Sequence, residues 1–203
     1  MIGLINYGSG NFQSVANVLK YLQIDYIEIT DFRKIKNLSH IILPGVGSYN
    51  DLITRLNRLE ITEELLNQIN NKKIFYLGIC VGMQILSDFG TENFKSKGLE
   101  LIGGSVDKIK VLKNTLPNIG WHKVSLEKKN SALFKNIYEE ELFFYFVHSY
   151  TFNLTDQGDC SSSIFYEKKL VASVEKDNIF GVQFHPEKSQ VAGLKLLKNF
   201  SNL

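Results

Sequence analysis

Apolar residues are distributed differently in the two halves of the chain. Between short apolar runs in the first half, Val15, Val18, Leu19 and Leu22 recur at i, i+3, i+4 and i+7, which places them on one helical face. Strands that alternate with amphipathic helices are typical of a parallel sheet covered by helices on both faces. The runs that predict these strands are MIGLINY at 1–7, DYIEIT at 25–30, HIILPG at 40–45 and KIFYLG at 73–78.

Further helices are predicted in the first half from the same spacing. The leucines and isoleucines of 52–59 indicate one helix, which is broken near Thr62 and resumes over 65–69. The segment VGMQILSDF at 81–89 predicts another helix directly after the strand at 73–78.

From Ser105 onward the pattern changes to short strands joined by turns. A closing helix is predicted from the spacing of Val191, Leu194, Leu197 and Phe200, with Ser189 as its N-cap. The expected fold class is therefore α/β: one domain over 1–203, with a mostly parallel sheet flanked by helices and an antiparallel section in the C-terminal half. The strand regions behind this antiparallel section are SVDKIKVL at 105–112, HKVSL at 122–126, LFFYFVHSY at 142–150, SSSIFYEKKLVASVEKD at 161–177 and IFGVQFHP at 179–186, with hairpin turns at YEKK and EKDN.

Composition and charge narrow the functional classes. With 203 residues, 44% of them hydrophobic, the chain is long enough to bury one sizeable core. The formal net charge is +2 and no basic block occurs, which disfavours nucleic-acid binding. No signal peptide and no apolar run of membrane-spanning length is found. The two cysteines, Cys80 and Cys160, imply neither a disulfide framework nor a metal site, so we expect a cytoplasmic protein. We also expect neither a metal nor a cofactor, since no feature of the sequence implies one.

The segment from Gly78 to Gly82 reads G-x-C-x-G, a pattern that places a nucleophile on a sharp turn between a strand and a helix. Glycines suit such a turn because side chains next to a strained corner residue would collide. The N-terminus of the following helix favours the thiolate of Cys80, and the amide of Val81 is placed to bind an oxyanion. The alternative interpretation is that Cys80 is a small buried hydrophobic residue, as we expect for Cys160.

A cysteine nucleophile needs a base, and the base needs an orienting partner. Of the four histidines, His40 begins a predicted strand, whereas His185 lies in GVQFHPEKS, where the following proline favours extended backbone. Residues i and i+2 of an extended segment share a face, so Glu187 can accept a hydrogen bond from the His185 ring. This gives a Cys80, His185, Glu187 triad; the alternative is a turn with a solvated Glu187.

Six motifs together resemble a known family. They are YGSGNFQSV, LPGVGSY, GICVGMQ, PNIGWHKV, YFVHSY and GVQFHPEKSQVAGLKLLKNF, in the order in which the family carries them. The resemblance extends from Asn6 nearly to the C-terminus. The chain is identified by them as similar to the class I, or triad, glutamine amidotransferases. Within that family it looks most like the glutaminase subunits of imidazole glycerol phosphate synthase, which implies a flavodoxin-like fold.

The resemblance implies a glutaminase that releases ammonia and glutamate through a cysteine thioester. Cys80 would be the nucleophile, His185 the proton shuttle and Glu187 its orienting group. The amides of Val46 and Gly47, in PGVG, would join Val81 in the oxyanion hole.

Four residues would contact glutamine by the same resemblance: Gln84, Glu92, Ser149 and Tyr150. From the sequence alone, Gln84 reads equally as a surface helix residue, and Glu92 as an ordinary loop acid.

The resemblance also implies a partner, because ammonia formed in water must be conducted to an acceptor site. The family uses a separate (β/α)₈-barrel cyclase, with which the glutaminase forms a heterodimer in histidine biosynthesis. Asn11, Trp121 and Lys188 match positions near that interface, although Trp121 could equally be a core residue. The chain has His122 where the family usually has asparagine, which is either a tolerated variant or the mark of a paralogue that supplies ammonia for modifying surface sugars.

Two other classes are compatible with parts of the pattern. A partner-independent cysteine hydrolase of the α/β-hydrolase type uses a similar corner, but it places its acid before the histidine. A non-catalytic binding subunit would not need all three triad positions, which are filled here.

Overall fold

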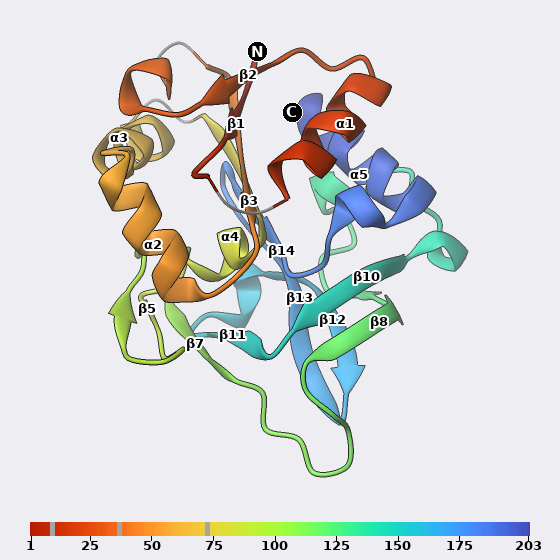
Figure 1. The fold of residues 1–203 in the computed structure, drawn as a ribbon. Helices are drawn as coiled ribbons and strands as arrows, with labels where there is room; N and C mark the ends of the chain where they lie inside the picture. Colours follow the sequence, from red (N-terminus) through yellow and green to blue (C-terminus); the bar gives the residue numbers. More distant parts are fainter. Residues whose placement is uncertain (9–10, 36–37, 72–73) are drawn as a thin grey trace.

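The fold is organised around a sheet that combines strands from both ends of the chain (Figure 1). The computed structural model describes residues 1–8, 11–35, 38–71 and 74–203. The middle of the predicted GSGN turn and the first residue of the predicted strand at 73–78 therefore lie outside the described residues.

Within the described residues the main sheet has eight strands, in the order β2-β1-β3-β4-β14-β13-β12-β9. The first five are mutually parallel and the last three run antiparallel to their neighbours, which confirms the expected division of the sheet. The strands are β2 (Tyr26–Ile29), β1 (Ile2–Ile5), β3 (His40–Gly45), β4 (Phe75–Cys80), β14 (Ile179–Val182), β13 (Lys168–Lys176), β12 (Cys160–Tyr166) and β9 (Ser125–Leu126).

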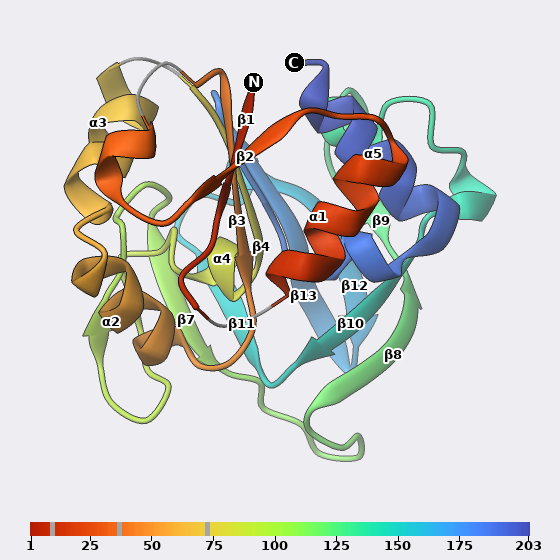
Figure 2. The same cartoon turned by 45° about the horizontal axis from the view of Figure 1, so that its top comes forward.

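Helices cover both faces of this sheet, as the apolar strands predicted. Seen nearly along its edge, α2 (Tyr49–Arg58) and α3 (Thr62–Asn71) lie on one side, and α1 (Phe12–Tyr21) and α5 (Gln190–Ser201) on the other (Figure 2). Strands β1 and β3 are buried along their whole length because both of their faces are covered.

Two smaller sheets flank the carboxyl ends of the parallel strands. One has the order β11-β7-β5-β6, and the other is the antiparallel pair of β10 and β8. Their strands are β5 (Phe89–Gly90), β6 (Ser96–Lys97), β7 (Gly104–Lys108), β8 (Asn118–Lys123), β10 (Phe143–His148) and β11 (Tyr150–Leu154). Short 3₁₀ turns are η1 (Phe32–Ile35), η2 (Ala132–Phe134), η3 (Glu139–Glu141), η4 (Gln157–Asp159) and η5 (Pro186–Lys188).

The predicted helix at 81–89 is wrong beyond its first turn, because α4 spans only Val81–Gln84. The carbonyl groups that would continue the helix are bound elsewhere. The Ile85 carbonyl accepts from the Leu99 amide at 2.7 Å, and the Leu86 carbonyl accepts from the amides of Leu101 and Ile102, both at 3.0 Å. A passing loop therefore ends the helix after one turn, and a helix dipole contributes little at Cys80.

The closing helix differs in detail from its prediction. Ser189 stands at the N-cap of α5, but its hydroxyl makes no capping bond. Instead it donates to the His185 carbonyl at 2.6 Å and accepts from the Tyr145 amide at 3.0 Å. Val191 is 56% exposed, and the buried face is formed by Ala192, Gly193, Leu196, Leu197 and Phe200.

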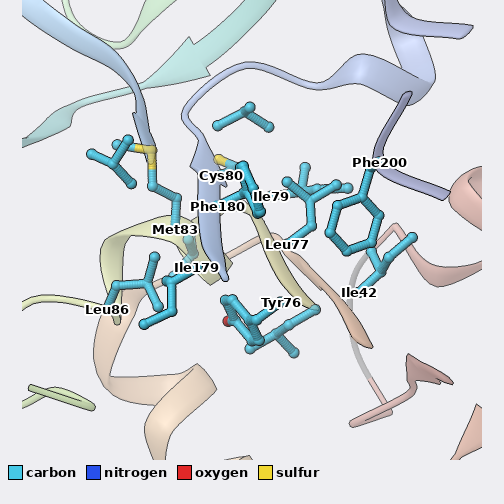
Figure 3. Packing of buried hydrophobic residues seen from close by; sticks show 14 of the residues in the cluster. Ile42, Tyr76, Leu77, Ile79, Cys80, Met83, Leu86, Ile179, Phe180 and Phe200 are labelled. Atoms are coloured by element: carbon cyan, nitrogen blue, oxygen red, sulfur yellow. The ribbon is translucent and has the colours of Figure 1, made fainter. Parts of the chain in front are cut away.

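A continuous apolar core lies beneath the end of β4. Ile79 and Cys80 lie close to Phe180 of β14, with Met83 of α4 nearby (Figure 3). Cys80 itself is 4% exposed. The candidate nucleophile therefore packs against a continuous layer of buried apolar side chains. No helix in the described part of the chain is both long enough and apolar enough to cross a membrane.

Candidate active site

The corner at Cys80 has the strained backbone that the G-x-C-x-G pattern predicts. Cys80 adopts φ 55° and ψ −111°, a conformation that is costly for a residue with a side chain. A Cβ atom on Gly78 would overlap the backbone of Gly82, and a Cβ on Gly82 would overlap the Leu43 carbonyl oxygen. Both glycines are therefore required for packing, since backbone from β4, α4 and β3 meets here without room for a methyl group.

His185 and Glu187 lie together as predicted, but the segment that joins them is not extended, because Pro186–Lys188 forms the 3₁₀ turn η5. The Nδ1 atom of His185 is 2.7 Å from Oε1 of Glu187, and the two side chains are 1% and 0% exposed. The same Glu187 oxygen accepts from the Asn11 side-chain amide. With Nδ1 engaged, Nε2 of His185 is left buried and without a hydrogen-bond partner among the described residues. That nitrogen is the one available for proton transfer.

The ring of His185 is held in its charged form. Burial opposes the charge, but the nearby Cys80 sulfur and the hydrogen-bonded Glu187 carboxylate prevail and raise the pKa of His185 to about 10. A charged ring therefore lies beside Cys80, and the thiolate is the form in which a cysteine acts as a nucleophile.

Nine of the residues predicted from the sequence line one cavity of about 280 Å³. They are Val46, Gly47, Cys80, Val81, Gln84, Glu92, Ser149, Tyr150 and His185, joined by Pro117, Val147 and His148, which the sequence analysis did not predict. Glu187 does not line the cavity and reaches it only through His185. The size suits a small amino acid, and the cavity has cationic, anionic and amide groups on its walls.

Two of the substrate-binding candidates are fixed by protein contacts. The Glu92 carboxylate accepts from the Tyr49 amide at 2.8 Å, at the start of α2, so it is not an unattached loop acid. The Gln84 side chain is 3% exposed and donates to the Tyr150 carbonyl at 3.2 Å, so it is not a surface helix residue.

The predicted oxyanion segment is attached to a tyrosine. The Val46 amide donates to the Tyr7 hydroxyl at 3.1 Å, and the Val46 carbonyl lies 3.5 Å from the same oxygen. In this arrangement the Val46 amide is engaged by the protein and is not offered to a substrate oxygen. Gly47 has φ 91°, in the region that favours glycine.

A chain of hydrogen bonds connects His122 to the cavity wall. Nε2 of His122 lies 2.8 Å from Oδ1 of Asn118, and Nδ2 of Asn118 lies 3.0 Å from Nε2 of His148. Nδ1 of His148 lies 2.8 Å from the Tyr150 carbonyl, which can only accept. His148 therefore carries its proton on Nδ1, and burial, with smaller repulsion from His122 and His185, lowers the pKa of His148 to about 4.

The three interface candidates divide into two kinds. Trp121 is 45% exposed on β8 and packs edge-on against Tyr145, with ring centroids 6.0 Å apart. The Lys188 ammonium lies 5.9 Å from the Tyr145 ring centroid on the opposite strand. These two thus share a surface with Tyr145, whereas Asn11 binds Glu187 and supports the triad from behind.

The remaining histidine and cysteine candidates lie apart from this cavity. His40 begins β3 and stacks on Phe75 with ring centroids 5.2 Å apart. Cys160 is buried in β12, and burial raises the pKa of its thiol to about 11, so it remains an unreactive thiol at neutral pH. Among the described residues, no cluster of three or more histidine, cysteine or carboxylate side chains is arranged to hold a metal ion.

Gln183 is the main site residue that the sequence analysis missed. Its side-chain nitrogen is 3.6 Å from Sγ of Cys80, and its oxygen is 2.9 Å from the side-chain nitrogen of Gln84. The signal was present, because Gln183 stands two residues before His185, as Glu187 stands two residues after it. The spacing that paired His185 with Glu187 also predicts that Gln183 shares their face.

Comparisons with known proteins agree with this geometry. The family described as "Glutamine amidotransferase class-I" matches residues 4–202. A Pelagibacter ubique (strain HTCC1062) protein named imidazole glycerol phosphate synthase subunit HisH is 42% identical over 209 residues, covering 100% of this chain and 99% of that protein. A Leptospira borgpetersenii protein of the same name is 41% identical over 207 residues, covering 100% of both.

Solved structures share the fold at low identity. A crystal structure described as a glutamine amidotransferase superposes with a TM-score of 0.75 at 16% identity, over 100% of this chain and 99% of that one. The structure of PurLQS from Thermotoga maritima gives a TM-score of 0.72 at 19% identity, over 99% and 97% of the two chains. Sequence, fold and site thus agree, and the chain belongs to the class I glutamine amidotransferase family.

Proposed function

We propose that this chain is the glutaminase subunit of an imidazole glycerol phosphate synthase, and that it hydrolyses glutamine to glutamate and ammonia for use by a second subunit. The observation that carries the proposal is the arrangement around one cavity of a strained cysteine corner and a buried His185–Glu187 pair. The names of full-length relatives at about 40% identity support the pathway.

In the first half-reaction the thiolate of Cys80 attacks the side-chain amide carbon of glutamine, and the carbonyl electrons move to oxygen. The amides of Val81 and Gly47, and of Val46 once it is released from Tyr7, stabilise that oxyanion. The intermediate collapses with cleavage of the carbon–nitrogen bond. His185 donates its Nε2 proton to the departing nitrogen, so ammonia leaves and a glutamyl thioester remains.

In the second half-reaction the neutral His185 accepts a proton from water at Nε2 as the water attacks the thioester. Collapse of this intermediate releases the Cys80 thiolate and glutamate, whose new carboxyl group loses its proton to solvent. Glu187 holds the ring through Nδ1 in both steps and stabilises the imidazolium. Asn11 fixes Glu187 by its own hydrogen bond. Gln84, Glu92, Ser149 and Tyr150 hold the amino-acid end of glutamine.

The ammonia passes to a (β/α)₈-barrel cyclase subunit with which this chain forms a heterodimer. The exposed Trp121 and Lys188, with Tyr145 between them, form part of the contact surface. The bond from His122 to Asn118 gives His122 a local structural reason, so it does not by itself call for a different acceptor.

Glutamate release by the purified chain tests the chemistry. Cys80→Ser is expected to abolish glutamate formation, because a serine hydroxyl at this corner is not ionised at neutral pH. The matched control is Cys160→Ser, which removes the other cysteine and is expected to retain the activity. Persistence of activity in Cys80→Ser would remove Cys80 from the nucleophile role.

Stimulation by the second subunit tests the pathway. The chain is assayed alone and with the barrel cyclase of the histidine pathway from the same genome, with that subunit's ribonucleotide substrate present. Glutamate release is expected to rise strongly only with the complete set. If both proteins are folded and no stimulation occurs, the acceptor is a different subunit.

A further inference from the structure

The sulfur of Cys80 has a side-chain donor that belongs to no member of the predicted triad. Nε2 of Gln183 lies 3.6 Å from Sγ, within the range of an N–H···S hydrogen bond. Gln183 is fully buried, and its backbone amide donates to the Ala172 carbonyl at 2.8 Å. The donor is therefore fixed by the sheet, directly beyond the end of β14.

Neighbouring groups determine which way this side-chain amide points. The Tyr150 carbonyl can only accept, so Gln84 turns its nitrogen toward it, at 3.2 Å. The same nitrogen lies 2.9 Å from Oε1 of Gln183 and donates its second proton there. The oxygen of Gln183 is thereby held on Gln84, and its N–H₂ group is left facing Sγ. Both amide orientations follow from one backbone carbonyl.

We propose that Gln183 is the hydrogen-bond donor that stabilises and orients the thiolate of Cys80, and that Gln84 is a positioning residue that aims this donor. The inference rests on the proposed glutaminase function and adds two residues to its nucleophile. A donor to an ionised acceptor forms a charge-assisted bond, which is about twice as strong as a neutral one. The protonated thiol has a poorer partner, since the acceptor found for it, the Val147 carbonyl, lies 4.0 Å away. The surroundings thus offer the sulfur a donor and only a distant acceptor.

This donor acts on the nucleophile and leaves the oxyanion to the backbone amides. Gln183 would orient Sγ for attack before glutamine binds. It would donate a hydrogen bond to the Cys80 thiolate again when the thioester is cleaved. Removing it should therefore lower kcat and the reactivity of the free thiol, with little change in KM.

The test is the pH dependence of Cys80 alkylation by iodoacetamide in a Cys160→Ser background, where Cys80 is the remaining cysteine. Gln183→Met keeps the length of the side chain and removes the donor. The midpoint of its alkylation profile is expected to rise by about one pH unit, and kcat to fall about tenfold at pH 7, because a hydrogen bond to a charged group contributes about that much. An unchanged midpoint in folded Gln183→Met would overturn the proposal.

Gln84→Met distinguishes positioning from general structural damage. Gln84 makes no hydrogen bond to Sγ, so its effect on the alkylation midpoint must pass through Gln183. We expect a smaller rise in Gln84→Met than in Gln183→Met, and no further rise in the double variant. Independent, additive shifts would overturn the positioning role.

Folding and the proposed function are controlled separately. If Gln183→Met does not fold, Gln183→Asn replaces it, since a shorter amide remains polar but cannot reach Sγ. The same upward shift is then expected, and its absence would overturn the proposal. Alkylation needs no glutamine, so failure of the glutaminase reaction would leave this result unaffected, and an unchanged midpoint with active enzyme would concern Gln183 alone.

Discussion

The two sides of the cavity are held in place by different interactions, close backbone packing on one side and a hydrogen bond on the other. On one side, the Cys80 corner is wedged among backbone atoms: a Cβ on Gly78 would overlap Gly82, and a Cβ on Gly45 would overlap the Gly82 amide. On the other side, the segment after β3 has open space, and a Cβ on Gly47 would meet nothing within 4 Å. In this segment the Val46 amide donates a hydrogen bond to the Tyr7 hydroxyl at 3.1 Å.

This difference separates a preassembled part of the site from an adjustable part. The proposed nucleophile, its proposed base and its proposed donor are held by close packing and buried hydrogen bonds, which a ligand cannot easily rearrange. The Val46 amide, which we propose for the oxyanion hole, is held by a hydrogen bond of ordinary strength, and binding energy from a substrate or a partner subunit could exchange it. Control of activity is therefore expected to act on the Val46 side.

The largest effect should come from adding a methyl group to the wedged side. Gly78→Ala is expected to lower the free energy of unfolding by about 3 kcal/mol, because backbone atoms cannot move aside as a flexible side chain can. Gly47→Ala on the open side should cost only about 1 kcal/mol, from its positive φ. Urea unfolding measures both.

A matched control for these two variants is Gly103→Ala, whose Cβ would lie 3.6 Å from Thr155, an ordinary contact. It should unfold within experimental error of the wild type. Equal losses for Gly78→Ala and Gly47→Ala would contradict the distinction between a wedged and an open side.

The next largest effect is a pH dependence of the stability, and it comes from His148 in the cavity wall. The pKa of His148 in the folded protein is about 4, below its ordinary value near 6.5, so the unfolded chain takes up a proton at a higher pH than the folded one. The neutral ring therefore contributes about 3 kcal/mol to the free energy of unfolding above pH 6.5, and this contribution is lost as the pH falls toward 4.

Nitrogen-15 NMR of the His148 ring measures both its tautomer and its pKa. The proton should reside on Nδ1, because that atom faces the Tyr150 carbonyl, and the ring should stay neutral until about pH 4. A proton on Nε2, or a titration midpoint near 6.5, would contradict this prediction and would show that His148 belongs to the adjustable part of the site.

Much of the preassembled side could be predicted from the sequence, because local pattern determines it. Apolar runs predicted the parallel strands, the two glycines around Cys80 predicted the sharp corner, and the proline after His185 predicted the extended backbone of His185, although Glu187 reaches the ring through a 3₁₀ turn. Each depends on residues close together along the chain.

The features that sequence reasoning missed depend on distant segments. The length of α4 is set by the amides of residues 99, 101 and 102, which bind the carbonyls of Ile85 and Leu86 directly after the helix. The Tyr7 bond to Val46 and the chain from His122 to Tyr150 each join separate parts of the chain. Hydrophobic periodicity carries no information about such pairs, whereas the position of Gln183, two residues before His185, could have been used.

Releasing the adjustable side should change activity more than stability. Tyr7→Phe keeps the buried ring and removes the hydroxyl that binds Val46. A hydrogen bond is worth about 0.5–1.5 kcal/mol, so glutamate release without a partner is expected to rise about two- to tenfold. A steady-state glutaminase assay of the isolated chain measures it.

Tyr76→Phe is the corresponding control on the wedged side. The Tyr76 hydroxyl is buried and donates to the Gly82 carbonyl at 3.0 Å, so it fastens the corner as Tyr7 fastens Val46. This variant should lose about 1 kcal/mol of stability without any gain in partner-independent activity. A similar gain in both variants would mean that the rate is limited by general loosening of the site.

The smallest effect tests whether the oxyanion segment is also held at its other end. Ser48 follows Gly47 and caps α2, accepting from the Asp51 amide at 3.3 Å. Ser48→Ala should cost about 1 kcal/mol in urea unfolding, whereas Ser48→Asp, which keeps an acceptor, should cost little. If Tyr7 alone holds Val46, the partner-independent rate of Ser48→Ala stays at the wild-type level, because the Val46 amide remains bound. A rise matching that of Tyr7→Phe would instead show that the segment is held by the helix cap as well, and that both attachments must open before the amide can turn toward the substrate.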